Sequence, residues 1–270
     1  MSEKLVRLDR LLVMRGLGSR RSIQRLIKRG EVSLKGELIT RPEFRLSQQS
    51  ELSVSGEVSR PLPLLIAYHK PLGQLSTLRD PWGREGLDRA LPPQWRELFH
   101  PVGRLDADTS GLLLFSSDGG VTQRLLHPKR EIPRSYLAHI HALPEELTES
   151  LSAGVDTSLG RFTATVERID RLTPQSPRPQ GAEDAVATIT LSVCEGKHRM
   201  VRRMLHNAGA SVLALHRVSY GPVKLTKGVP EAPSHTQTTD TEVDQETLSV
   251  GAWREVSADE LSALEVSFKT

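Results

Sequence analysis

The chain has 270 residues, of which 37% are hydrophobic and 26% charged, an ordinary composition for a globular protein with a buried core. Its single cysteine, Cys194, excludes a disulfide framework within the chain, and apolar runs such as 64–67 and 111–115 are far too short to span a bilayer. Charged residues interrupt the first twelve positions, where a secretion signal needs an unbroken apolar run, so we expect a cytoplasmic protein.

The net charge of +3 is unevenly distributed. Residues 4–60 hold thirteen lysines and arginines against six acidic residues, about +7, so the remainder is mildly acidic. A basic N-terminal fifth on a near-neutral body favours a polyanion-binding module joined to a second domain. A merely solvated basic surface is the alternative.

The N-terminal segment predicts two short helices followed by small strands. Leucines at positions 8, 11 and 12 have helical spacing and stop before Gly16, and Ser19 is a good N-cap for a second helix that ends at Gly30. The basic residues of the second helix fall on a face away from its apolar stripe, and a cationic stripe of this kind suits the phosphates of a nucleic-acid backbone. These residues are Arg21, Arg25, Lys28 and Arg29.

This segment resembles the S4 RNA-binding module. The strings RLDRLL, SRRSIQRLIKRGEVSLKG and ELSVSG match its pattern over roughly residues 4–56. The resemblance implies that the basic stripe contacts RNA. We place an S4-like domain at 1–58, a proline-punctuated connector around 59–64 and a second domain at 62–270.

Strands and helices are interspersed in the second domain, with no regular βαβ period and no internal repeat, which indicates a mixed α+β class. Strands are predicted at 64–70, 134–142 and 185–193, and helices near 86–91 and over 118–126, 144–154 and 199–209. The stretch 253–264 also has a helical pattern. Polar, proline-rich stretches at 173–184 and 230–246 predict loops, the second lying in a mobile insert at about 228–247.

An aspartate-rich turn, GRLDADTSG at 103–111, is the first candidate site. Asp106, Asp108 and Ser110 fit the first positions of a calcium loop, but Ser117 stands where a bidentate glutamate is needed. A phosphatase-type aspartate pair requires an apolar strand directly before the first aspartate, and none precedes it. A plain turn in which an aspartate caps backbone amides is the structural alternative. The neighbouring Arg104 also allows a single carboxylate held ionised by a cation.

Two further stretches carry candidate residues. Alternation places Tyr136 on one face of a strand, where packing is the simpler interpretation. His139 and His141 have ligand-like spacing but no third partner nearby, so we expect no metal site. In 194–209, cations lie opposite an apolar stripe and suit phosphates or one buried carboxylate, a solvated basic face being the alternative. They are Lys197, Arg199, Arg202, Arg203 and His206.

Together and in this order, the motifs resemble the pseudouridine synthases that modify bacterial ribosomal RNA, a group that joins an N-terminal S4 module to its catalytic domain. The matching strings are HPVGRLDADTSGLLLFSSDG, HPKREIPRSYLAHI, EGKHRMVRRML and GAWREVSADEL. The resemblance implies isomerisation of a uridine within RNA, without cofactor or metal, by a domain with a mixed, mainly antiparallel sheet. The first string looks closer to enzymes of large-subunit RNA than of small-subunit RNA. A non-catalytic S4-type assembly factor is the rival hypothesis.

The resemblance also implies a role for each candidate residue. Asp106 is the nucleophile, and Arg202 pairs with it and keeps it ionised. Tyr136 stacks on the target base and assists proton removal, while Arg104 contacts RNA and helps to eject that base. Asp108 is expected to shape the turn. The expected partner is ribosomal RNA or a ribosome-assembly intermediate, bound by a monomer through the S4 stripe and through the further cations Lys197, Arg199 and Arg203.

Overall fold

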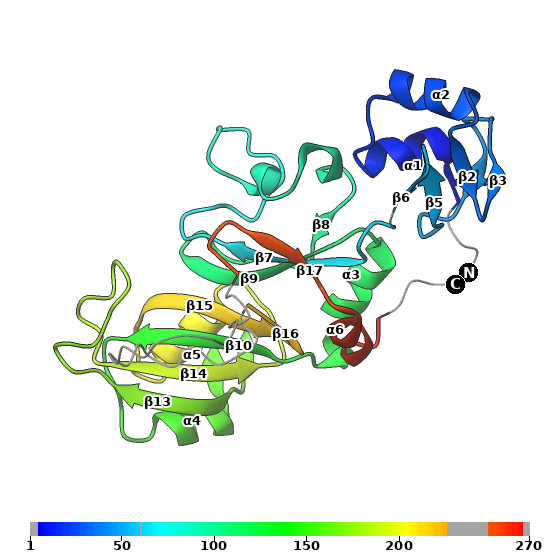
Figure 1. Ribbon diagram of the computed structural model, residues 1–270. Helices are drawn as coiled ribbons and strands as arrows, with labels where there is room; N and C mark the ends of the chain where they lie inside the picture. Colours follow the sequence, from blue (N-terminus) through cyan, green and yellow to red (C-terminus); the bar gives the residue numbers. More distant parts are fainter. Residues whose placement is uncertain (1–4, 60, 226–247, 267–270) are drawn as a thin grey trace, which may run out of the picture.

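The computed structural model describes residues 5–59, 61–225 and 248–266, and within these ranges the chain forms a small N-terminal unit and a larger sheet domain (Figure 1). The insert predicted at about 228–247 lies outside the described residues. In the parts described, no helix combines the length and apolar character needed to cross a membrane. The mixture of helices and mainly antiparallel strands confirms the predicted α+β class.

The N-terminal unit packs two helices on a small antiparallel sheet of order β3-β2-β5-β6. Its elements are β1 (Val6–Arg7), α1 (Leu8–Met14), α2 (Arg20–Lys28), β2 (Val32–Leu34), β3 (Glu37–Leu38), β4 (Arg45–Leu46), β5 (Leu52–Val54) and β6 (Glu57–Ser59). Leucines of α1 and isoleucines of α2 form the core of this unit. The Ser19 side chain accepts a hydrogen bond from the Ser22 amide at 3.3 Å, which confirms the predicted N-cap of α2.

The larger domain is built on one extended sheet of order β13-β14-β10-β15-β9-β7-β17, to which β16 adds on β15 and β8 on β9. Its elements in chain order are β7 (Leu65–Lys70), η1 (Leu87–Arg89), η2 (Pro93–Trp95), β8 (His100–Pro101), β9 (Thr109–Ser116), α3 (Gly119–Leu126), η3 (Pro128–Arg130), β10 (Arg134–Ile140), α4 (Leu147–Ala153), β11 (Val155–Thr157), β12 (Gly160–Phe162), β13 (Thr165–Arg171), β14 (Ala187–Val193), α5 (Met200–Asn207), β15 (Val212–Tyr220), β16 (Val223–Lys224), β17 (Trp253–Glu255) and α6 (Ala258–Ala263).

The pairing of β9 with β15 is the one parallel contact in the described part of this sheet, and it places Thr109–Gly111 beside Leu215–Arg217. Parallel neighbours begin at the same edge of a sheet, so the segments that lead into them also meet there. The segment before β9 is the loop 103–108, and the segment before β15 contains α5. The fold therefore brings together two of the three stretches that hold candidate residues.

The two halves of the sheet are covered differently. Along β10, Tyr136, Ala138 and Ile140 are buried and the intervening residues are half-buried, as the sequence alternation predicts. Met204 and Leu205 of α5 join the same core cluster, so this helix packs on the buried face. β7 and β9 have core on both faces, because α3 and α6 cover the side opposite to that cluster. Burial on both faces explains why 111–115 is a continuous apolar run.

Two element predictions need correction. The stretch 253–264 is helical only in its second half: Trp253–Glu255 forms β17, antiparallel to β7. The free edge of β7 offers backbone hydrogen bonds that outweigh helix propensity there. The helix α6 begins after Ser257, which forms a capping box with Glu260. The helix predicted over 144–154 is also shorter, because α4 begins at Leu147.

We predict that Gly111→Ala destabilises the larger domain. Gly111 has φ +109°, and a Cβ at this position would lie 2.3 Å from the Arg217 carbonyl oxygen, so β9 and β15 would have to separate. We expect a loss of at least about 2 kcal/mol and a melting temperature lower by roughly 4–8 °C in calorimetry. Gly119→Ala is the control, because a Cβ added there would meet nothing within 4 Å. An unchanged melting temperature for Gly111→Ala would contradict the prediction.

Candidate active site

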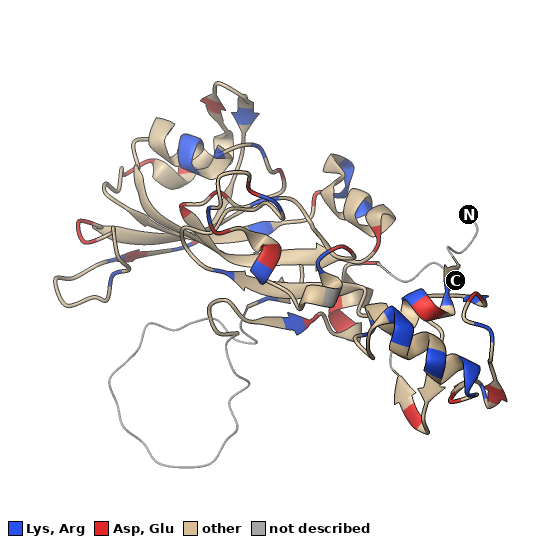
Figure 2. Ribbon diagram, turned by 90° about the horizontal axis from the view of Figure 1, so that it is seen from above, with Lys and Arg blue, Asp and Glu red and all other residues tan. Residues whose placement is uncertain are grey.

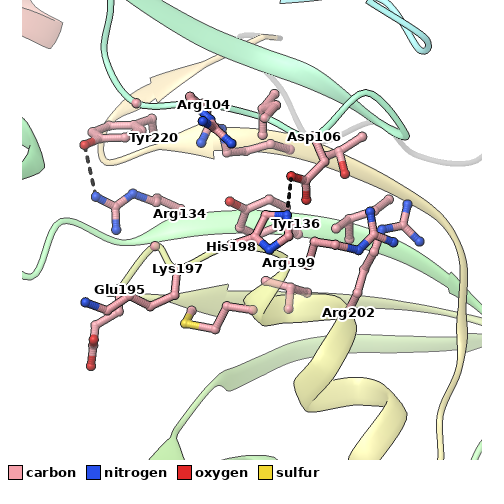
Figure 3. A pocket seen from close by; sticks show the side chains of 18 of the residues that line it. Arg104, Asp106, Arg134, Tyr136, Glu195, Lys197, His198, Arg199, Arg202 and Tyr220 are labelled. Carbon is pink, nitrogen blue, oxygen red and sulfur yellow. Dashed lines mark hydrogen bonds and ion pairs between the residues drawn. The ribbon is translucent and has the colours of Figure 1, made fainter. Parts of the chain in front are cut away.

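A pocket of about 490 Å³ lies where the loop before β9 meets β10, β15 and the segment leading into α5 (Figure 3). The structure brings most of the catalytic-domain candidates to this pocket, and they come from three separate stretches of sequence. Arg203 is not among its lining residues: it points to Ser158 in the β11–β12 turn and donates a hydrogen bond to that hydroxyl. The candidates that line the pocket are Arg104, Asp106, Tyr136, Lys197, Arg199 and Arg202.

The backbone around Asp106 is fixed from both sides by the loop that follows β7. The Ser76 hydroxyl donates to the Leu105 carbonyl at 2.6 Å and accepts from the Leu105 amide at 3.1 Å. The Gly73 amide donates to the Ala107 carbonyl at 2.8 Å. Three hydrogen bonds between two short segments therefore hold the turn, and the Asp106 side chain remains one-quarter exposed. A nucleophile needs this combination of a rigid backbone and an accessible carboxylate.

Among the described residues, the only basic side chain within 4.0 Å of the Asp106 carboxylate is His198, whose Nε2 lies at that distance. The expected ion pair between Asp106 and Arg202 is wrong for this structure. The Arg202 Nε instead lies 3.4 Å from the carboxylate of Asp108. Figure 3 shows Asp106 facing His198 and Tyr136, with Arg202 farther along α5.

Asp108 does more than shape the turn, because it also pairs with two arginines. Two guanidinium nitrogens of Arg199 contact the Asp108 carboxylate at 2.9 and 3.0 Å. Arg199 precedes α5 with φ 54°, a left-handed conformation that aims its guanidinium back toward the β9 loop. Burial alone raises the pKa of Asp108, but the Arg199 hydrogen bond and the charges of Arg202 and Arg199 outweigh it, so the pKa is lowered. Asp108 is thus the ionised partner of both arginines.

Arg202 also joins the ends of the two parallel strands. Its Nη2 donates to the Asp108 carbonyl at 2.6 Å, directly before β9, and its Nη1 donates to the Val212 carbonyl at 3.1 Å, at the start of β15. Burial lowers the pKa of Arg202 more than the nearby aspartates raise it, yet the group remains a cation at neutral pH. Arg202 therefore holds α5 against the loop that carries Asp106.

Two buried cations near the pocket were not anticipated from the sequence. Lys70, at the end of β7, is fully buried and donates to the carbonyls of Pro71 and Thr109 at 3.0 and 2.9 Å. Arg217, on β15, is 3% exposed and lines the pocket. Its Nε donates to the Leu112 carbonyl at 2.7 Å, while its Nη2 has no partner among the described residues. A lysine and an arginine inside otherwise apolar strands were the signal available in the sequence.

Aromatic rings and a further arginine form another wall. Tyr136 is 8% exposed and lines the pocket. Arg134 lies over the Tyr220 ring, with its Cζ 4.9 Å from the centroid, and donates to the Cys194 carbonyl at 2.9 Å. Cys194 itself is exposed and belongs to the pocket rim. An accessible carboxylate between cations and a tyrosine ring suits attack on an electrophilic carbon of an anionic, ring-containing substrate. In the described ranges, no three His, Cys, Asp or Glu side chains gather as a metal site.

The N-terminal unit presents a second basic surface. The stripe residues of α2 are all exposed, and Figure 2 shows lysines and arginines along this helix. Beneath them, the fully buried Asp9 accepts hydrogen bonds from Arg7 at 3.0 Å and from Gln24 at 2.9 Å and pairs with Arg20 at 3.4 Å. The hydrogen bond from Arg7 has the largest effect on the pKa of Asp9. Together with the one from Gln24, it lowers this pKa well below its ordinary value despite burial. This carboxylate orders the side chains where α1 meets α2.

We predict a pH-dependent contribution of Lys70 to stability. Burial lowers its pKa from 10.5 to about 8, partly opposed by the charges of Asp106 and Asp108. Between about pH 8 and 10 the unfolded chain binds this proton more tightly than the folded chain, so raising the pH stabilises the wild type. In denaturant unfolding, the stability of the wild type relative to Lys70→Met should rise over that window and stay constant from about pH 6 to 7.5. Parallel pH profiles would contradict a buried, neutralisable Lys70.

Comparison with known proteins agrees with this geometry. Residues 64–207 match the RNA pseudouridylate synthase family, and residues 6–52 match the S4 domain. The chain is 34% identical to ribosomal large subunit pseudouridine synthase B of Vibrio cholerae over 239 residues, 85% of this chain and 70% of that protein. It is 31% identical to the protein of the same name from Bacillus subtilis, over 81% of this chain and 87% of that one.

The fold has a solved counterpart as well. A crystal structure of a pseudouridylate synthase superposes with a TM-score of 0.58 at 22% identity, over 96% of this chain and 99% of that chain. The family matches and the relatives confirm the resemblance noted in the sequence motifs, for the S4 segment and for the synthase segment. This chain belongs to the RNA pseudouridylate synthase family and carries an N-terminal S4 domain.

Proposed function

We propose that this protein converts a specific uridine of large-subunit ribosomal RNA into pseudouridine, with Asp106 as the nucleophile. The observation that carries the proposal is the Asp106 carboxylate, held by a rigid turn and open to a pocket lined by cations and Tyr136. The relatives from Vibrio cholerae and Bacillus subtilis are named for the large ribosomal subunit, which supports that RNA over the small-subunit alternative. The S4 stripe supplies a second contact with the same RNA.

The reaction rearranges one nucleoside without gain or loss of atoms. The Asp106 carboxylate attacks the extruded nucleoside, the bond between N1 and the sugar carbon breaks, and the freed uracil turns within the pocket. A bond then forms between C5 and the sugar carbon, the carboxylate is released, the C5 proton leaves, and N1 ends protonated. Tyr136 lies beside this path, so its ring stacks on the base and its hydroxyl assists removal of the C5 proton.

The surrounding cations serve RNA binding and base extrusion. Flipping a base out of its stack costs a few kcal/mol, and contacts with the displaced backbone offset that cost. Arg104 and Lys197 line the pocket beside Asp106 and are assigned to RNA contacts. Arg199 lines it too, and we expect it to contact the RNA while it holds Asp108. Arg202 acts through Asp108 and the two strand ends, and so positions the nucleophile. The enzyme works as a cytoplasmic monomer on ribosomal RNA or an assembly intermediate.

A non-catalytic RNA-binding factor is the competing function. Such a protein has no use for a carboxylate that repels RNA phosphates at the centre of a cationic pocket. Asp106 lies in that position, and three hydrogen bonds hold its turn. The catalytic proposal accounts for that carboxylate, whereas the binding proposal leaves it without a role.

Asp106→Asn should abolish pseudouridine formation, with a loss of at least about a thousandfold, because the amide is neither charged nor nucleophilic. Release of tritium from 5-tritiated uridine in ribosomal RNA measures the reaction, and mapping pseudouridines in RNA from a deletion strain identifies the target. Affinity for the RNA should be unchanged or higher, since a negative charge is removed. Substantial turnover by this variant would exclude Asp106 as the nucleophile.

Neutralising the α2 stripe should weaken binding without changing the chemical step. For each of Arg25→Gln and Lys28→Gln, the slope of log affinity against log salt should fall by about 1, because one phosphate contact is lost. The rate at saturating RNA should stay at the wild-type value. Glu37→Gln, an exposed substitution on β3 of the same unit, is the control. A salt slope unchanged by both stripe variants would place the RNA elsewhere on this domain.

A further inference from the structure

The loop between β7 and η1 presents an exposed tryptophan that the reaction chemistry does not use. Trp82 is 77% exposed, the highest value among the large apolar side chains of the described residues. The other two tryptophans, Trp95 and Trp253, pack against each other with ring centroids 5.1 Å apart. Exposing an indole to water is unfavourable, and tryptophan is enriched at binding surfaces.

Trp82 is held in a fixed orientation. The Arg84 guanidinium lies over one face of its ring, with Cζ 5.0 Å from the centroid. Asp80 holds this arginine at 2.7 Å and accepts hydrogen bonds from the Trp82 and Arg84 amides at 3.1 and 2.9 Å. The Asp80 carboxylate is only 4% exposed, so the loop is organised around a buried anion. One face of the indole is thus backed by a cation, while 77% of the residue remains exposed to solvent.

The same loop is tied to the nucleophile. The Tyr68 hydroxyl of β7 donates to the side-chain oxygen of Gln74 at 3.0 Å. The side-chain nitrogen of Gln74 donates to the Gly86 carbonyl at 3.0 Å. The Leu87 amide donates to the Thr77 carbonyl at 2.7 Å, and Gly86 approaches that carbonyl too closely for any Cβ. The base of the loop also supplies Gly73 and Ser76, which hold the backbone on both sides of Asp106, so one continuous segment connects Trp82 with the turn of the nucleophile.

We propose that Trp82 is a stacking site for a nucleobase of the substrate RNA, outside the pocket that receives the target uridine. This inference rests on the proposed function and adds a second point of base recognition to it. An aromatic ring backed by a guanidinium stacks on any base, and a preformed platform loses little conformational entropy on binding. Arg79, exposed in the same loop, is available to the adjoining phosphate.

RNA is a better occupant than a protein partner because of where the loop is anchored. Gly73 and Ser76, at the base of the loop, are hydrogen-bonded to the Asp106 turn. We therefore expect a base that lies on Trp82 to belong to the same RNA whose uridine enters the pocket. An exposed protein contact would not need the Asp80 anchor and the Arg84 support beneath the ring. The stacked base then determines the register in which the strand enters the pocket.

The test uses the full chain and a transcribed large-subunit RNA fragment carrying the mapped target uridine. Trp82→Ala should bind this fragment about 5- to 100-fold more weakly, whereas Trp82→Phe should retain most of the affinity. The rate at saturating RNA should be unchanged for both variants, because Trp82 does not touch the reacting atoms. Val250→Ala, which removes another exposed apolar side chain from the same domain, should bind like the wild type.

A direct readout of stacking comes from tryptophan fluorescence. The fragment should quench the part of the wild-type emission that Trp82→Phe lacks, and it should leave the remaining emission of Trp82→Phe unchanged, because base stacking quenches indole. Wild-type affinity for Trp82→Ala together with unquenched Trp82 emission would overturn the proposal and leave the indole as a protein contact. A lowered saturating rate would also overturn it, since that result assigns Trp82 to the support of the Asp106 turn. Failure of the proposed function is distinguishable from both of these results, because the wild-type protein would then form no pseudouridine.

Discussion

The site depends on the parallel contact between β9 and β15. Every other pairing in the described sheet is antiparallel, so this contact alone joins one half of the sheet to the other and makes the leading segments of two strands converge. One leading segment carries Asp106 and the other carries α5. Arg202 completes the junction by donating to the carbonyls of Asp108 and Val212 at the two strand ends. The pairing of these two strands therefore fixes the position of the proposed nucleophile. The pocket forms where the starts of β9 and β15, which are far apart in the sequence, lie side by side.

Some charged groups around the junction stabilise the structure, and others remain available for the proposed reaction. Arg199 and Arg202 are paired with Asp108, so their attraction stabilises the turn, and the neighbouring carboxylate of Asp106 remains for a substrate. Lys70 and Arg217 lie deeper and are satisfied mainly by backbone carbonyls. Such buried cations contribute a positive field to the pocket without pairing with the Asp106 carboxylate. The Asp106 carboxylate therefore remains accessible, with His198 as the only basic side chain of the described residues within 4.0 Å of it.

The sequence predicted local features well and long-range pairings poorly. The cap at Ser19 and the alternation along β10 depend on neighbours in the chain, and the structure has them where expected. The partner of Arg202 depends on the backbone conformation at Arg199 and on whether Asp106 or Asp108 faces α5. No residue pattern determines either of these features. For the same reason the pattern at 253–255 predicts helix where the chain forms a strand, since the free edge of β7 is distant in sequence. The family motifs located the pocket, and its buried cations became visible only in the structure.

The position of Cys194 gives the protein a practical property. It is the single cysteine of the chain, it is exposed, and it belongs to the rim of the pocket that holds Asp106. A thiol-reactive fluorophore or crosslinker therefore attaches at one defined point beside the active site, without any engineered substitution. Such a label reports the arrival of RNA at the pocket separately from its capture by the S4 domain, so the order of the two contacts is open to direct kinetic observation.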